Sequence, residues 1–585
     1  MSLLKFKSIN RKYDDDSSWN LYDNNKQVYV DKEEYDVSPT RDKLFNQDTI
    51  VVNDKNEFVK IIHSCNRIER TMPAILSFNK MYGKTSNNKY YFRATPDDIR
   101  VPEFLVPYKL KKSEFLKKVK SRYVVIRYVN WNEKHPIGQI ISSIGDVEIL
   151  PHFYEYMLYC KSLNTSLQQF TQNTMLFLKK TNEKRHIREI IDNPNYNIET
   201  RGDEWNIICI DPKMSKDFDD GFSVNKTIYN EKNATLLSIY ISNVPIWLDS
   251  MNLWDSFSER ISTIYLPDRK RPMLPSILSD KLCSLQSGKT RIAIVLDIYI
   301  NSENTIVHHE YKNVAISISN NYDYDDTKGL LNDKTYTNAF NLISHLNHYS
   351  RYKHVDKIID SHDIVAYLMV LMNYISATDL RDNKAGIFRT IKLKESHKKI
   401  PSEIPTNIKQ FLTGWNSSGG KYVKFSEYDS HDMLNLDAYV HITSPIRRIV
   451  DILNIMTIMK VKNLNTFQDD SGAQRFLDKW TSPEKFEYIN VSMRSIRRLQ
   501  NKCEILEKCH TQPELLNKTF TGFCFDKLKR ADGFYQYVVY LPELKMINKF
   551  TDNIDIDNYS ERDFQLFLFK DEASFKQKIK MNIVV

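Results

Sequence analysis

Short hydrophobic runs separated by polar clusters occupy both ends of the chain. In the N-terminal part they lie at Val28–Val30, Ile50–Val52, Phe58–Ile62, Tyr90–Phe92, Val124–Val129 and Gln139–Ile144. Beyond Lys518 they return at Phe520–Phe525, Gln536–Leu541, Phe564–Phe569 and Lys578–Val585. Runs of this length between Asn, Asp, Gly and Lys clusters are typical of strands in small barrels. The pattern predicts two tandem barrels near the N-terminus and a third at the C-terminus.

The middle of the chain has a different pattern, in which strands are followed by long segments with helical spacing. The predicted strands are Trp205–Ile210, Leu236–Val244 and Arg291–Ile300, and the predicted helices cover about 335–348, 361–380, 445–462 and 484–510. These segments predict a mixed α/β domain. The expected organisation is a flexible tail at 1–25, barrels at 26–104 and 105–165, a linker of helix and polar residues at 166–199, the α/β domain at 200–512 and a barrel at 513–585.

Composition adds few constraints to this picture. A net charge of +9 suits a polyanionic partner, but it fits a protein with surplus surface lysines equally well. Seven cysteines without a CxxC pair favour neither a disulfide framework nor a zinc ribbon, and they fit a reducing, cytoplasmic compartment. Because no run of 18 apolar residues occurs, no membrane segment is expected.

Four aspartates stand within ten residues, directly after an apolar strand. They are Asp211, Asp217, Asp219 and Asp220, in the segment ICIDPKMSKDFDDGFSV. Clustered carboxylates repel one another, so such a group needs a cation. Hard oxygen ligands favour Mg²⁺, for which Mn²⁺ can substitute, and a pair of these ions is the usual device for phosphodiester hydrolysis. The cluster is therefore a candidate site for such divalent ions.

Other interpretations of the cluster need weighing. An acidic surface loop is the commoner explanation of a D-x-D-D spacing, although the apolar strand before Asp211 argues against a plain solvated loop. A calcium-binding EF-hand loop is excluded, because the sixth and twelfth positions from Asp217 are Phe222 and Ile228 in place of Gly and Glu.

A second informative stretch is HITSPIRRIVDIL at residues 441–453. Thr443, Ser444 and Pro445 predict a helix start, with a hydroxyl cap followed by proline in the first turn. Free N–H groups at such a start bind anions, and Arg447 and Arg448 supply guanidinium groups suited to phosphate. The alternative is an ordinary capped helix with surface arginines.

Together the two stretches closely resemble the ribonuclease II/R (RNB) family, which includes bacterial ribonuclease R and the catalytic subunit of the eukaryotic exosome. That family has I-D-P followed by D-x-D-D, and later H-x-T-S-P-I-R-R. Between them, STIYLPDRKRPMLPSILSDKLCSL at 262–285 resembles its YLP…PMLP…LS…LCSL pattern. The segment VVIRYVNW…HPIGQIISSIG also resembles its second cold-shock-type barrel. The resemblance covers about residues 25–585 and favours a stand-alone member, such as a viral one.

The resemblance implies a multidomain α+β protein, with a central mixed α/β RNB catalytic domain flanked by small β-barrels of the cold-shock/OB type. By position, Asp211 and Asp220 would hold the tighter metal ion. Asp217 and Asp219 would complete the second metal site, with Asp219 the least replaceable.

The RNA-binding residues that the resemblance implies are Arg447 at the scissile phosphate, Tyr265 stacking on the 3′-terminal bases, and Arg448, Ser444 and Glu504. For Tyr265 the alternative is an ordinary core aromatic residue. For Glu504 it is a carboxylate on a helix surface.

The activity implied is processive, hydrolytic 3′→5′ degradation of single-stranded RNA to nucleoside 5′-monophosphates, with two Mg²⁺ ions. The expected partner is the single-stranded RNA 3′ end, with no membrane, no small-molecule cofactor and a monomeric chain. Two departures from the family, Asn243 in place of Asp and Ile449 in place of Tyr, motivate a second hypothesis. In that hypothesis the chain is a catalytically decayed RNA-binding protein, and a DNA nuclease is a third class.

Overall fold

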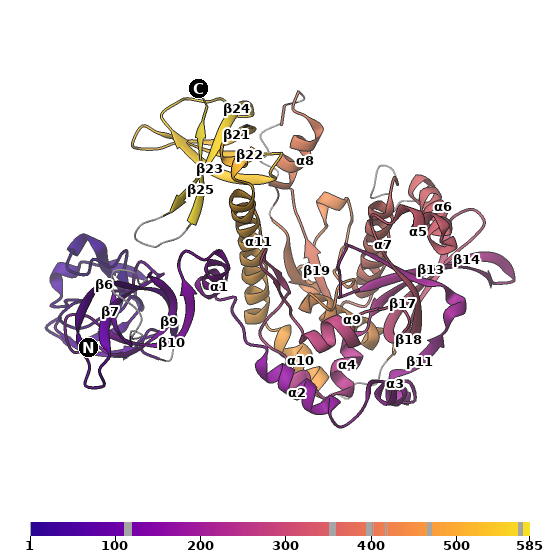
Figure 1. The fold of residues 1–585 in the computed structure, drawn as a ribbon, viewed down its shortest axis with the longest axis horizontal. Helices are drawn as coiled ribbons and strands as arrows, with labels where there is room; N and C mark the ends of the chain where they lie inside the picture. The colour runs from indigo at the N-terminus through magenta and orange to yellow at the C-terminus, as the bar shows by residue number, and fades with distance from the viewer. Residues whose placement is uncertain are drawn as a thin grey trace. The chain divides into compact units, whose positions relative to one another are not determined.

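The computed structural model describes residues 2–584 apart from 69, 110–119, 350–357, 394–399, 402, 416, 418, 465–470 and 571–576. The chain divides into two compact units, whose elements are labelled in Figure 1. One unit contains Met1–Asn164, Leu266–Asp268 and Asn501–Val585, and the other contains Thr165–Tyr265 and Arg269–Gln500.

The first strands form a five-stranded antiparallel sheet in the order β3-β2-β1-β4-β5. They are β1 (Ser2–Ser8), β2 (Trp19–Asp23), β3 (Val28–Val30), β4 (Thr49–Val52) and β5 (Phe58–His63). The predicted flexible tail at 1–25 is wrong, because β1 is the central strand of this sheet. Leu4 and Phe6 alternate with polar residues and are fully buried. The acidic residues of the predicted tail lie in the turn between β1 and β2, where the Asp15 side chain accepts a hydrogen bond from the Ser17 N–H.

The next strands close into a barrel in the order β10-β8-β7-β6-β9. They are β6 (Thr71–Lys84), β7 (Tyr90–Pro96), β8 (Phe104–Tyr108), β9 (Arg122–Asn130) and β10 (Ile137–Asp146). The predicted boundary between 104 and 105 is wrong because it falls inside β8. The sheet and the barrel share one hydrophobic core, in which the Phe45 ring stacks on Phe104 with 5.9 Å between centroids.

The C-terminal strands form a five-stranded antiparallel sheet in the order β23-β22-β21-β24-β25. They are β21 (Thr519–Lys529), β22 (Tyr535–Leu541), β23 (Met546–Asp552), β24 (Ser560–Lys570) and β25 (Gln577–Ile583). Four of these strands overlap the predicted runs, and β23 is additional. The helix α1 (Leu150–Cys160) also belongs to this unit.

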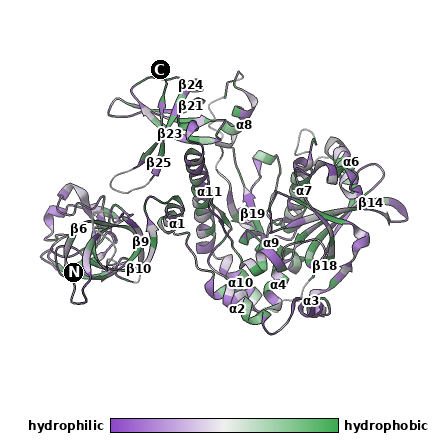
Figure 2. Cartoon of the chain, in the orientation of Figure 1, coloured by the Kyte–Doolittle hydropathy of each residue, from purple (hydrophilic) through white to green (hydrophobic). Residues whose placement is uncertain are grey.

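The second unit is built on a six-stranded mixed sheet in the order β11-β18-β12-β13-β14-β17, with β17 also pairing with β18. The strands are β11 (Ile198–Arg201), β12 (Ile207–Asp211), β13 (Asp220–Tyr229), β14 (Lys232–Ser242), β17 (Thr290–Ile300) and β18 (Ile306–Asp323). This sheet confirms the predicted mixed α/β class. Figure 2 shows hydrophobic stretches in its strands and in the helices packed near them.

Helices and short hairpins complete this unit. The helices are α2 (Gln168–Leu178), α3 (Glu183–Ile191), α4 (Val244–Ser250), α5 (Thr327–Asn332), α6 (Lys334–Tyr349), α7 (Ser361–Asp382), α8 (Thr406–Trp415), α9 (Ile449–Val461), α10 (Gly472–Trp480) and α11 (Pro483–Thr511), which continues into the other unit. β15 (Ile264–Tyr265) and β16 (Lys270–Arg271) form a short hairpin, and β19 (Ile387–Thr390) and β20 (Lys421–Lys424) form a two-stranded sheet with α8 between them in the sequence. The segment 166–199, predicted as helix and polar linker, contains α2 and α3, and the buried Phe170, Ile187 and Ile190 make it part of the folded unit.

Within the described residues, α7 alone is long and apolar enough to cross a membrane by length and composition. About three fifths of its apolar window (61%) is buried inside the protein, as in a core helix. It packs against α6 and α9.

Candidate active site

The loop between β12 and β13 brings the first and last aspartates of the cluster to one edge of the sheet. Asp211 ends β12 and Asp220 begins β13, and the two strands pair antiparallel at Ile208 and Phe222. β18 runs parallel to β12 and ends beside it, with Asp323 opposite Asp211. Strand ends that meet in this way hold carboxylates close together without any helix or disulfide.

Burial and mutual repulsion perturb three of the four carboxylates. Burial, together with the nearby charges of Asp220 and Asp219, raises the pKa of Asp211 to about 9. Burial raises the pKa of Asp219 to about 7 and that of Asp220 to about 6, although Arg447 opposes both shifts. One oxygen of Asp211, Oδ2, is buried and has no hydrogen-bond partner among the described residues. The group is therefore poised to take up a proton or a cation.

Asp219 links this loop to the second stretch that the sequence analysis selects. Its side chain is nearly inaccessible to solvent. Oδ1 accepts a 2.8 Å hydrogen bond from the Ile446 N–H, and Oδ2 accepts one from Arg447 Nε at 3.2 Å. The Arg447 side chain is still 45% exposed, so part of it remains accessible to a ligand.

The predicted helix start at Thr443–Pro445 is wrong. Residues 445–447 form a turn, and α9 begins only at Ile449, with no side-chain cap. The reason is that Arg448 has an extended backbone and pairs with Ser262 in an isolated bridge, which interrupts the helix. Ser444 therefore does not cap α9, and its hydroxyl instead accepts a 2.9 Å hydrogen bond from Arg447 Nη2.

The two arginines differ in availability. Arg448 Nη2 donates to Asp451 Oδ1 at 2.8 Å, and Asp451 is completely buried. The Arg448 guanidinium is thus held within the protein, whereas the Arg447 side chain remains partly accessible. Of the predicted pair, Arg447 is better placed to contact a phosphate.

Tyr265 is not a core residue, since 43% of its surface is exposed. It lies on β15 opposite Lys270 of β16, and its N–H donates to Gln500 Oε1 at 3.1 Å. Burial of its hydroxyl raises the pKa of Tyr265, and the negative charge of Asp217 acts in the same direction. An exposed aromatic ring thus stands beside the carboxylates.

Glu504 belongs to the other unit, on the part of α11 that begins at Asn501. Its carboxylate is exposed and pairs with Lys508 one helical turn away, at 2.8 Å. This is the contact expected of a carboxylate on a helix surface.

Asp217 has a partner that the sequence analysis does not identify. Lys270 Nζ lies 2.9 Å from Asp217 Oδ1 and 2.9 Å from Asp280 Oδ1. Asp280 comes from a π-helical turn, Leu278–Leu282. These three side chains come from three separate segments, so no local spacing in the sequence connects them.

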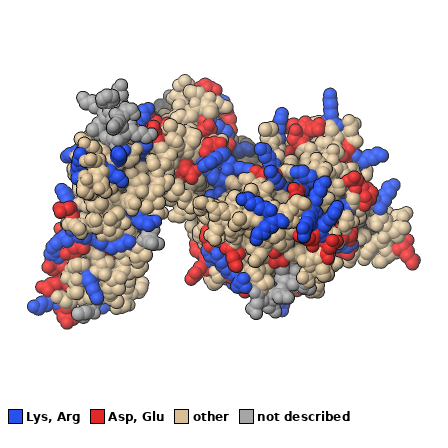
Figure 3. Space-filling model, turned by 60° about the horizontal axis from the view of Figure 1, so that its bottom comes forward, with Lys and Arg blue, Asp and Glu red and all other residues tan. Residues whose placement is uncertain are grey.

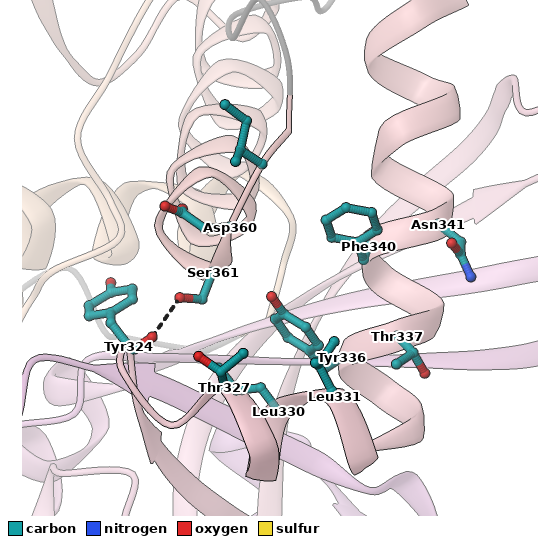
Figure 4. A pocket seen from close by; sticks show the side chains of 11 residues that line it. Tyr324, Thr327, Leu330, Leu331, Tyr336, Thr337, Phe340, Asn341, Asp360 and Ser361 are labelled. Carbon is teal, nitrogen blue, oxygen red and sulfur yellow. Dashed lines mark hydrogen bonds between the residues drawn. The ribbon is translucent and has the colours of Figure 1, made fainter.

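A cavity of about 370 Å³ lies next to the aspartates and is also missed by the sequence analysis. One of its walls is Tyr324, whose N–H donates to the Asp211 carbonyl at 3.2 Å and whose ring stacks on His362 at 3.8 Å between centroids. Figure 4 shows Tyr324, Tyr336 and Phe340 around this cavity, with the Ser361 hydroxyl bonded to the Tyr324 carbonyl. Tyr324 directly follows β18, the strand parallel to β12, and this position in the sequence could have indicated that Tyr324 lies near Asp211.

Not all four aspartates are suited to bind a metal ion. Across the part of the chain that the structure describes, no three His, Cys, Asp or Glu side chains converge closely enough to hold a metal ion. Asp217 is bound to Lys270, and Asp219 is bound to Ile446 and Arg447. Asp211 and Asp220, with a buried unpaired oxygen and hard donors, fit one divalent ion completed by water or substrate oxygens.

The raised pKa values predict a pH-dependent stability when divalent ions are removed. A carboxyl group whose pKa is raised on folding stabilises the protein fully below its unfolded value, near 3.8 for Asp211, and this contribution is lost as the pH rises through about 9. In EDTA, the melting temperature of the wild type should therefore fall between pH 6 and pH 9 more steeply than that of Asp211→Asn. Thermal melts at closely spaced pH values measure this. Parallel curves for the two proteins would contradict the burial of an ionisable group at this position.

Two known domain families match parts of the chain. Residues 201–359 match the family described as RNB domain, and residues 91–151 match the Dis3-like cold-shock domain 2 (CSD2). The ribonuclease R of Mycoplasmopsis pulmonis is 26% identical over 278 residues, which are 46% of this chain and 34% of that protein. The chain thus matches about a third of the length of this relative.

Solved structures show a similar fold at low sequence identity. Mycoplasma genitalium RNase R in complex with ribose-methylated single-stranded RNA has a TM-score of 0.63 and 16% identity, covering 99% of this chain and 97% of that one. Yeast Ssd1, a pseudonuclease, has a TM-score of 0.53 and 14% identity, covering 93% of this chain and 78% of that one. The chain therefore carries an RNB domain and a Dis3-like cold-shock domain, and it resembles the ribonuclease R proteins of the RNB family.

Proposed function

We propose that this chain is a processive 3′→5′ exoribonuclease that hydrolyses single-stranded RNA to nucleoside 5′-monophosphates, in a cytoplasmic compartment. The observation that carries the proposal is the group formed by buried Asp219 and half-buried Asp211 and Asp220, beside the partly exposed side chain of Arg447. Ionisable groups perturbed together in this way are typical of active sites. The ribonuclease R relatives favour RNA as the substrate.

Each residue of the group has a distinct role in the proposal. Asp211 and Asp220 would hold a divalent ion, which supplies an activated water and offsets charge on the phosphate. Asp219 fixes Arg447 through its ion pair, and the Ser444 hydroxyl fixes a second nitrogen of the same guanidinium. Arg447 is thereby oriented before substrate arrives, and a pre-oriented cation stabilises charge that develops at the phosphate.

The two small sheets and the barrel would hold the rest of the RNA strand. Lys7 lies over the Tyr22 ring at 3.5 Å in the first sheet, and Lys580 lies over the Phe569 ring at 3.9 Å in the C-terminal sheet. Partly exposed rings paired with lysines suit stacked bases and phosphates without sequence preference. Figure 3 shows lysines and arginines gathered in patches on the face drawn, with acidic side chains among them.

Tyr265→Ala is expected to lengthen the shortest RNA that remains after digestion. Base stacking on an aromatic ring is worth about 1–3 kcal/mol, so short ends should dissociate before the last cuts. Because Tyr265 is 43% exposed, the fold should survive the change. Gel analysis of limit products measures the effect, with Tyr265→Phe as the matched control that keeps the ring. An identical limit product in all three proteins would exclude a stacking role.

The experiment that tests the function uses end-labelled single-stranded RNA and DNA of the same sequence, with Mg²⁺, Mn²⁺ or EDTA. The proposal expects nucleoside 5′-monophosphates from RNA alone, released from the 3′ end and only with a metal ion. Degradation of DNA at a similar rate would favour a DNA nuclease. RNA binding without degradation under any of these conditions would refute the proposed activity.

A catalytically decayed RNA-binding protein is the second candidate. The ion pair of Asp217 with Lys270 favours this candidate. The similar fold of yeast Ssd1, a pseudonuclease, is a second argument for it. The substitution at Asn243, which motivates this hypothesis in the sequence, gives it little support in the structure. That side chain is fully buried, accepts from the Ile246 N–H at the start of α4 and donates to Asn313 Oδ1 at 2.9 Å. Its role is therefore structural.

A further inference from the structure

Lys270 lies among the acidic residues in the manner of a bound cation. Its ammonium contacts Asp217 and Asp280 at equal distances of 2.9 Å. Asp280 is itself fixed, because the Ser279 hydroxyl donates to its Oδ1 at 2.7 Å. All three charged side chains are partly buried, with 27%, 13% and 20% of Lys270, Asp217 and Asp280 exposed. The pairs are consequently less screened by solvent than ordinary surface pairs.

The position of Lys270 is fixed by the backbone. β16 pairs with β15, with Lys270 opposite Tyr265 and Arg271 opposite Ile264. The Lys270 ammonium donates one hydrogen bond to Asp217 Oδ1 and one to Asp280 Oδ1. An amine held by two carboxylates supplies one positive charge and occupies Asp217 Oδ1, an oxygen that a divalent ion would otherwise use.

The four aspartates consequently differ in their positively charged partners. Asp217 meets Lys270, and Asp219 meets Arg447. Asp211 has a buried oxygen without a partner among the described residues, and Asp220 begins the strand that pairs with the one ending at Asp211. We propose that Lys270 takes the place of one of two divalent ions, so that the protein binds a single ion at Asp211 and Asp220. This inference rests on the proposed metal-dependent function, because it concerns the ion that would serve that reaction.

The test is a count of bound ions, which does not depend on activity. Purified full-length protein is titrated with Mn²⁺, and bound ions are counted by calorimetry and by electron paramagnetic resonance of the free ion. The wild type is expected to bind one ion. Lys270→Met, which removes the ammonium and frees Asp217 and Asp280, is expected to bind two. Lys462→Met is the matched control, because Lys462 is equally exposed (30%) and pairs with Asp379 at 2.6 Å away from the cluster.

Asp217→Asn and Asp211→Asn keep the inference testable if Lys270→Met fails to fold. Asp217→Asn should leave the count at one, because Asp217 is already bound to Lys270, whereas Asp211→Asn should abolish binding. Two ions or none on the wild type, one ion on a folded Lys270→Met, or a lost ion in Asp217→Asn would each overturn the inference. The RNA assay judges the function separately. A wild type with one ion and no RNA cleavage refutes the nuclease and leaves the role of Lys270 standing.

Discussion

Asp219→Asn should abolish most RNA cleavage while RNA binding stays near the wild-type level. Asparagine keeps the size of the side chain and can still accept from the Ile446 N–H, but it loses the ion pair with Arg447. A misdirected Arg447 would no longer meet the charge that develops on the phosphate. Loss of one such pre-oriented group typically costs about 10²–10³ in turnover. Single-turnover cleavage and RNA affinity of the purified proteins measure the two effects separately.

Asp249→Asn provides the matched control for this change. Asp249 is in the same unit and accepts hydrogen bonds from the Tyr196 hydroxyl at 2.7 Å and Trp254 Nε1 at 2.9 Å. Both of these partners lie outside the cluster, so the replacement of Asp249 should leave turnover unchanged. Near-normal turnover of Asp219→Asn would refute the site assignment. Inactivity of the wild type and both variants, with RNA still bound, would favour the decayed nuclease.

Asp297→Ala should produce the largest loss of stability. Asp297 on β17 receives two hydrogen bonds from the Arg201 guanidinium of β11 and one from the Ser238 hydroxyl at 2.6 Å. Both charged side chains are 1% exposed. Removing one partner of a buried pair leaves an uncompensated charge and costs about 3–5 kcal/mol. Denaturant unfolding followed by tryptophan fluorescence measures it, since the Arg201 guanidinium lies 4.0 Å from the Trp205 ring centroid.

Glu199→Gln is the control for the buried pair. Glu199 contacts the same guanidinium at 3.0 Å, but its side chain is 43% exposed. An exposed pair contributes about 0–1 kcal/mol, so this change should shift the unfolding midpoint little. Equal losses for the two variants would mean that burial does not set the strength of this network.

The sequence predicts those features of the site that depend on neighbouring residues. The apolar run before Asp211 predicts β12, and the D-x-D-D spacing predicts carboxylates gathered at the end of that strand. Long helices such as α7 and α11 follow from periodicity alone, because their apolar residues recur over many turns. In the same way the strand runs identify most of the C-terminal sheet.

The features that the sequence analysis misses depend on contacts between distant residues. Lys270 and Asp280 meet Asp217 only after three segments fold together. The extended backbone at Arg448 is set by its bridge to Ser262, which outweighs the local helix-start signal of Ser444 and Pro445. The sequence predicts a tail in place of β1, because the alternating run of β1 is short and an acidic turn follows it.

The stacking of Phe45 on Phe104 has a consequence for how the N-terminal region can be divided. Because the first sheet and the closed barrel bury their apolar residues in one shared core, neither has a complete core of its own. The two should melt in a single cooperative transition. A deletion or a proteolytic cut between β5 and β6 would then expose hydrophobic surface on both fragments and lead to aggregation. The smallest piece of this region able to fold alone would have to begin at β1 and include β10.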